Sequence, residues 1–125
     1  MLKKIFPFLM LPLLMAGCST TFSNLTATQQ PRNNENLYPV EFQFDSPEQA
    51  LRWDSIRPSI AVDDQFYPMR RVQLLTNRWE GLLPVPAGKG SVAYQYKVDY
   101  LFNDFGGPRS ETAISPKYHL IITDQ

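Results

Sequence analysis

The sequence is poor in the residues that build most catalytic and metal sites. Its 125 residues include one cysteine, Cys18, and one histidine, His119. One cysteine forms no internal disulfide, and a lone histidine without cysteines or a carboxylate at helical spacing is a poor metal ligand or catalytic base. Neither a phosphate-binding loop nor a serine-nucleophile elbow is recognisable. We therefore expect no metal, no cofactor and no enzymatic activity, although a convergent active site need not carry a readable motif.

An excess of charge of one sign is also absent. The chain has 12 Lys and Arg and 12 Asp and Glu, and without Lys3 and Lys4 the balance is 10 basic to 12 acidic residues, a charge of −2. Such a chain has no strong field to attract a polyanion, so we expect no nucleic-acid partner. Its length suits one domain with a real core.

Long apolar runs are missing too. The longest, at residues 5–15, has 11 residues, and a membrane-spanning helix needs about 20. This run follows a basic pair and precedes Ala16 and Gly17, which is the layout of a secretory signal peptide.

The end of that segment, Leu14-Met15-Ala16-Gly17-Cys18, resembles the lipobox of bacterial lipoproteins. It differs from the commonest form in having methionine, not leucine, three residues before the cysteine. The resemblance implies cleavage before Cys18 and attachment of lipid to its thiol. It also implies export to the outer membrane, facing the periplasm, because residue 19 is serine and not the aspartate that tends to retain such proteins in the inner membrane. An ordinary signal peptide with a chance cysteine is the alternative.

The expected organisation is a signal peptide at 1–17, a lipidated tether at 18–36 and a folded domain at 37–125. Whether residues 22–28 form a first edge strand stays open.

Strict alternation of apolar and polar residues marks the centre of the domain. Large apolar side chains occupy every second position of residues 91–103: Val92, Tyr94, Tyr96, Val98, Tyr100 and Phe102. Because side chains of a strand alternate between faces, this stretch predicts a central antiparallel strand. Further strands are expected at residues 37–45, 55–62, 65–72, 72–80 and 111–124, with a connection at 81–90, a turn at 103–110 and Pro116 splitting the last strand. Residues 46–53 read as a capped helical turn or a bulge. About seven short strands predict an all-β, antiparallel immunoglobulin-like β-sandwich.

Two further resemblances concern this domain. Leu82-x-Pro84 followed by Tyr94-x-Tyr96-x-Val98 resembles the region around the sixth strand of fibronectin type III and related immunoglobulin-like domains. It implies a tyrosine corner, in which the Tyr94 hydroxyl bonds upstream backbone. The strings RPSIAVDDQFYPM and NRWEGLLPVP resemble small bacterial lipoproteins, which implies a family but no activity.

One set of residues is a candidate interaction surface: Arg70, Arg71, Arg78, Trp79 and Phe105. The arginines suit cation–π packing on Trp79 or a carboxylate-bearing partner; a solvated strand face is the alternative. Asp63-Asp64 is read as a turn and not as a calcium site. We expect a non-enzymatic module that binds or scaffolds another envelope protein. The alternatives are a carbohydrate- or peptidoglycan-binding sandwich that uses exposed Trp79 and Phe105 and, less favoured, a small hydrolase.

Overall fold

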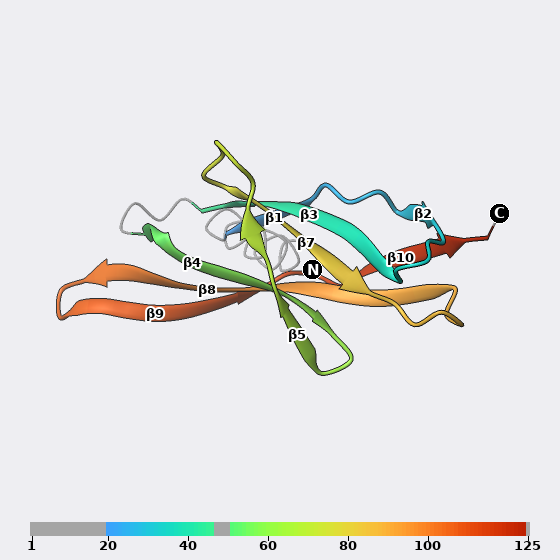
Figure 1. Cartoon of the computed structure of the whole chain (residues 1–125). Coiled ribbons are helices and arrows are strands. Elements are labelled where there is room, and N and C mark those ends of the chain that lie inside the picture. The colour runs from blue at the N-terminus through green and yellow to red at the C-terminus, as the bar shows by residue number, and fades with distance from the viewer. Residues whose placement is uncertain (1–19, 47–50, 125) are drawn as a thin grey trace, which may run out of the picture.

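Alternating apolar residues build two β-sheets that pack face to face (Figure 1). The structure, a computed structural model, describes residues 20–46 and 51–124. Within these residues the strands are β1 (Thr21–Asn24), β2 (Gln29–Pro31), β3 (Leu37–Asp45), β4 (Leu51–Val62), β5 (Gln65–Pro68), β6 (Arg70–Arg71), β7 (Arg78–Pro84), β8 (Ser91–Asp104), β9 (Gly107–Ile114) and β10 (Tyr118–Thr123). The prediction of an all-β sandwich is confirmed.

The order of the strands identifies the type of sandwich. One sheet has the order β1-β3-β7-β6, and the other has the order β2-β10-β8-β4-β5, with β9 also paired to β8. Immunoglobulin-like sandwiches place strands A, B, E and D in one sheet and C, F and G, with C′ in some domains, in the other. The two orders agree when β1, β3, β4, β5, β6, β7, β8 and β10 are taken as A, B, C, C′, D, E, F and G.

The chain has ten described strands instead of about seven because three predicted segments divide. The segment after the β4–β5 turn leaves the larger sheet at Met69 and joins the smaller one as β6. The last segment breaks at Pro116, as predicted, and both of its parts pair with β8. The N-terminal segment, for which a first edge strand was left open, supplies β1 to one sheet and β2 to the other.

The core lies between β3, β7, β8 and β10. The inward side chains of β8 are its centre: Val92, Tyr94, Tyr96 and Val98 are all buried. The Tyr96 ring stacks on Phe42 at 4.2 Å between centroids, and Phe42 stacks in turn on Trp79 at 5.9 Å. The alternation read from residues 91–103 and 37–45 is therefore the pattern that fills the core.

The predicted boundaries of the β6–β7 region were wrong. Residues 72–77 form a turn and not a strand, because Leu74 takes a left-handed backbone (φ 69°) that ends the extended run. Conversely, Gly81 to Pro84 belong to β7 and not to a connection. Leu83 is fully buried there. Gly81 fits close under Met69 and Ile60, since a β-carbon at Gly81 would lie 3.1 and 3.2 Å from their side chains.

Of two predicted turns, one lies where it was expected and the other is shorter than expected. Asp63 and Asp64 both have positive φ, 47° and 63°, and join β4 to β5, so the prediction of a turn is confirmed. The predicted turn at 103–110 is much shorter, since only Phe105 and Gly106 lie outside β8 and β9. The β8–β9 hairpin therefore projects beyond the two sheets, as the orange arrows in Figure 1 show.

Some predicted features fall on residues outside the described part of the chain. These are the signal peptide, Cys18 with its lipobox, and residues 47–49 of the predicted helical turn. Leu51 and Trp53, which were expected to pack from that turn, belong instead to β4. Across residues 20–46 and 51–124, no helix is long and apolar enough to cross a membrane.

Candidate functional site

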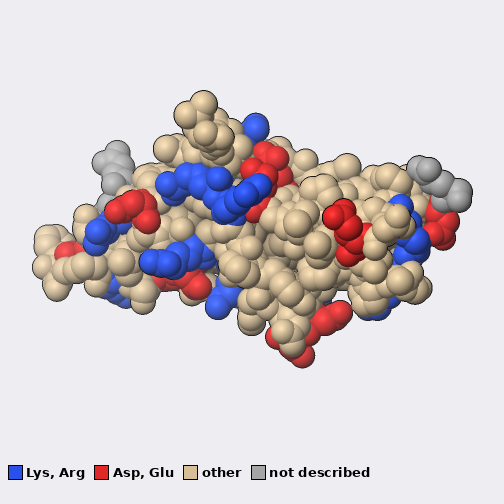
Figure 2. All heavy atoms as spheres, viewed as in Figure 1, with Lys and Arg blue, Asp and Glu red and all other residues tan. Residues whose placement is uncertain are grey.

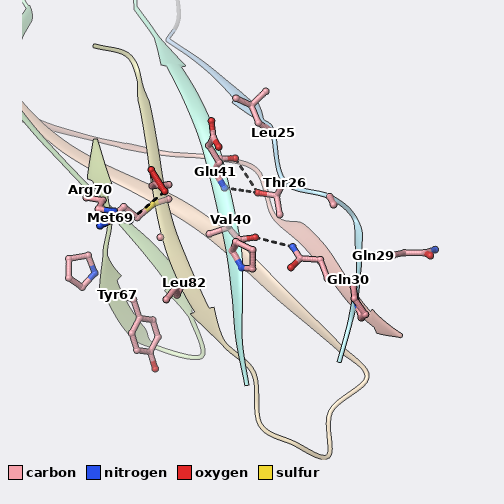
Figure 3. Close-up of a pocket in the computed structure, with 16 residues that line it drawn as sticks. Leu25, Thr26, Gln29, Gln30, Val40, Glu41, Tyr67, Met69, Arg70 and Leu82 are labelled. Atoms are coloured by element: carbon pink, nitrogen blue, oxygen red, sulfur yellow. Dashed lines mark hydrogen bonds and ion pairs between the residues drawn. The ribbon is translucent and has the colours of Figure 1, made fainter. Parts of the chain in front are cut away.

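A groove of about 1080 Å³ crosses the four-stranded sheet (Figure 3). Its floor is made by adjacent residues of β3 and β7, which pair Pro39 with Leu82 and Glu41 with Glu80. One wall comes from residues 25–31, which include β2, and the other from residues 67–70, where the chain passes from β5 to β6. In Figure 3 the labelled residues Leu25 and Gln30 lie on one side of β3, and Tyr67 and Met69 lie on the far side of β7.

The first wall is held by side chains that bond the free edge of β3. Thr26 Oγ1 accepts a hydrogen bond from the Glu41 N–H at 2.9 Å and donates to the Glu41 carbonyl at 3.1 Å. Gln30 Nε2 donates to the Pro39 carbonyl at 2.9 Å, and Asn33 Nδ2 donates to the Leu37 carbonyl at 2.9 Å. These contacts satisfy main-chain groups that an unpaired edge would otherwise offer to another strand. The polar residues of the predicted tether therefore act as part of the sheet.

The groove surface is mainly apolar. Leu82 is 53% exposed and Leu25 is 43% exposed, although both are large hydrophobic residues. Its charges are largely matched within the molecule, since Arg78 Nη1 lies 3.7 Å from Glu41 Oε2 and Arg70 Nη2 lies 3.8 Å from Glu80 Oε2. Figure 2 shows the same mixture, with acidic and basic side chains next to one another on the face in view. An apolar patch in a concave surface with few unmatched charges favours an apolar ligand group.

The predicted interaction surface is only partly assembled. Arg71 on β6 lies over the Trp79 ring at 5.1 Å from its centroid, and its Nη2 donates to the Trp53 carbonyl at 2.6 Å. Arg71 therefore packs over the indole, whereas Trp79 is 2% exposed and is no platform for a ligand. The reason is its pairing opposite Phe42, which turns the indole into the core. Phe105 is fully exposed, but it lies at the hairpin tip, away from the arginines.

A second polar network links the N-terminal segment to the core tyrosines. Tyr96 Oη donates to Asn24 Oδ1 at 2.6 Å and lies 3.1 Å from Thr26 Oγ1. Asn24 Nδ2 donates to Tyr94 Oη at 2.9 Å. Burial of the Tyr96 side chain raises the pKa of its phenol well above the usual value. The Tyr94 hydroxyl meets a side chain and not upstream backbone, so the predicted tyrosine corner was wrong. The reason is that β1 brings Asn24 to this position.

The C-terminal end of the sandwich is tied to the N-terminal segment by Arg32. Its Nε donates to Asp124 Oδ1 at 2.5 Å, and its two Nη atoms donate to the carbonyls of Ala87 and Lys89 at 2.7 and 3.0 Å. The hydrogen bond to Asp124 raises the pKa of the Arg32 guanidinium. One side chain thus joins β2, the β7–β8 loop and the end of β10. No feature of its local sequence indicated this role.

The described residues do not assemble a recognisable catalytic or metal centre. His119 lies opposite Ala93 on the exposed face of the larger sheet. Within residues 20–46 and 51–124, no group of three His, Cys, Asp or Glu side chains is placed to hold a metal ion. The groove itself contains carboxylates and hydroxyls but neither histidine nor cysteine.

Comparison with protein-family models, curated proteins and solved structures gives no match for this chain.

Proposed function

We propose that this chain is an exported lipoprotein, anchored through Cys18 in the outer membrane and facing the periplasm, whose immunoglobulin-like domain binds another envelope protein. The lipobox resemblance supports the anchor, and the groove supports the binding role. The partner contributes an extended segment with at least one large apolar side chain, which lies on the floor beside Leu82. No enzymatic step is part of this proposal.

The observation that carries the proposal is the exposed apolar floor of the groove. Leu82 is half exposed in the middle of a strand, so its apolar surface still contacts water. Burying that surface against a partner would stabilise the complex. The walls on both sides make the surface concave, which suits a partner side chain. The ion pairs of Glu41 and Glu80 leave little free charge on the floor, so recognition rests on apolar contact.

A carbohydrate-binding role has less support. Trp79, one of the two aromatic residues expected to stack on a sugar, is buried, and Phe105 lies alone at the hairpin tip. The groove offers a single aromatic side chain, Tyr67, which is half-buried. A protein partner therefore fits this surface better than a glycan does.

The test is a pair of matched substitutions measured by co-purification of the partner from cells. Leu82→Glu puts a carboxylate on the groove floor, and Leu74→Glu makes the same change at a turn residue that is 97% exposed and lies outside the groove. We expect Leu82→Glu to lower partner recovery about tenfold, since an unpaired charge in an interface costs more than about 1.4 kcal/mol. Leu74→Glu should leave recovery unchanged. Equal recovery with both variants would contradict the proposal.

A further inference from the structure

The start of β1 and the tip of the β8–β9 hairpin lie at the same end of the sandwich. Thr21, the first residue of β1, pairs with Asp45, the last residue of β3. The neighbouring Phe44 ring lies 6.0 Å from the Tyr100 ring on β8, and β8 continues from there to the hairpin tip. Strands β3 and β8 therefore run toward the same end, at which β1 also begins.

The lengths of these segments allow the hairpin tip and the predicted lipid to reach the same membrane surface. Phe105 is five residues beyond Tyr100, which is about 16 Å along an extended strand. Thr21 is only one residue beyond Phe22, whose ring packs on Phe44 at 5.3 Å. Thr21 is three positions after Cys18, a stretch of chain that spans at most about 10 Å. Both reaches start from the level of Phe44 and run in nearly the same direction, because the strands of packed sheets lie within about 30° of one another. Phe105 therefore extends at least as far beyond that level as Cys18 can.

The tip has the chemistry of a membrane contact. Phe105 is fully exposed to water at a two-residue turn. Asp104 fixes that turn, because its Oδ1 accepts from the Phe105 N–H at 2.8 Å and its Oδ2 accepts from Arg109 Nη1 at 3.0 Å. The pairing of Asp104 with Arg109 leaves the tip without net charge. A neutral hairpin that presents one aromatic ring is suited to the interfacial region of a bilayer, where aromatic side chains concentrate.

We propose that Phe105 inserts into the lipid bilayer beside the acyl anchor and serves as a second membrane contact. This inference rests on the lipidation of Cys18 proposed above. It differs from the expected lipidated tether at 18–36, because β1 begins three residues after Cys18. The sandwich is instead held with its β8–β9 end at the membrane, and the far end is directed into the periplasm.

The test places an environment-sensitive fluorophore at the tip of the full-length, processed protein in lipid vesicles. Phe105→Cys is the labelling variant, because lipidation consumes the thiol of Cys18 and leaves only the introduced cysteine to react. Phe66→Cys is the matched control: Phe66 is also an exposed phenylalanine, at 56%, and it lies opposite Ala61 and so near Gln95 of β8. That position is ten residues from the tip along β8, or about 33 Å.

We expect the probe at position 105 to shift its emission to shorter wavelength on vesicles and to be quenched by nitroxide-bearing lipids. The probe at position 66 should keep its aqueous emission and be quenched by iodide. A lipidated protein whose position-105 probe stays aqueous would overturn this inference and leave the anchor intact. An unmodified Cys18, detected by mass spectrometry of the same sample, would overturn the anchor and this inference together.

Discussion

Replacing Asn24 by alanine tests whether the N-terminal segment is part of the folded domain. The side chain joins two core tyrosines, at 2.6 Å to Tyr96 Oη and 2.9 Å to Tyr94 Oη. Alanine removes the shortest hydrogen bond of the Tyr96 hydroxyl, which keeps only longer contacts to Thr26 Oγ1 at 3.1 Å and the Glu41 carbonyl at 3.4 Å, in a site where Tyr96 is fully buried. A buried polar group that loses its partner costs about 1–3 kcal/mol, so we expect the free energy of unfolding to fall by about 2 kcal/mol. Domains of about 100 residues lose about 4–8 °C in Tm for each kcal/mol.

The assay is urea and thermal unfolding followed by circular dichroism. Asn34→Ala is the matched control, because Asn34 is an exposed asparagine of the same predicted tether, and surface changes of this kind stay within about 0.5 kcal/mol. Tyr96→Phe adds a double-mutant cycle: the two changes together should cost less than their sum, since each removes the same hydrogen bond. If Asn24→Ala and Asn34→Ala unfold at the same urea concentration, the segment is a tether and the reasoning is wrong.

Three further changes test the packing and the hairpin. Trp79→Ala should lower the free energy of unfolding by about 3–5 kcal/mol in urea titrations, because it empties a core site; a change near zero would mean an exposed indole. Gly81→Val should cost about 1–3 kcal/mol by overpacking, whereas Gly88→Val, with open space around it, should be nearly neutral in the same assay. In carboxyl NMR titrations, the hydrogen bonds from Arg109 and from the backbone should hold the pKa of Asp104 below its usual value. The stabilisation from that lowered pKa is present above the ordinary carboxyl pKa and is lost as pH falls through the lowered value. Arg109→Ala should raise the Asp104 pKa. An Asp104 pKa that does not change in this variant would contradict the hairpin contacts.

The central strands were predictable because their side chains alternate without interruption. In residues 37–45 and 91–104 every inward position near the core is a large apolar residue. The two-residue alternation of apolar side chains in the sequence therefore matches the alternation of buried positions in the strands. The predicted strand at 72–80 began too early, because the apolar residues Leu74 and Leu75 lie in an exposed turn between β6 and β7. Residues 81–84 were assigned to the predicted connection at 81–90, although proline is tolerated at the end of a strand and glycine where another side chain packs closely.

The groove was less predictable than the strands. Its walls come from residues 25–31 and 67–70, which are far apart in the sequence and cross between sheets at opposite edges of β3 and β7. The first wall is fixed by bonds from side chains to backbone, such as those of Thr26 and Gln30, and such bonds have no sequence period. Leu25 carried a weak signal, as an apolar residue in a polar stretch. The placement of Trp79 followed from its pairing with β3, which local sequence does not determine.

The most direct test of the central claim is photo-crosslinking in intact cells from position 82, in the groove floor. A photoreactive amino acid replaces Leu82 in the full-length protein, and the same residue replaces Leu74 in a parallel strain. We predict one dominant crosslinked envelope protein from position 82 and none of it from position 74. Crosslinks that are the same from both positions, or that are absent from position 82 although the protein is lipidated and folded, would contradict the claim that this groove binds a protein partner.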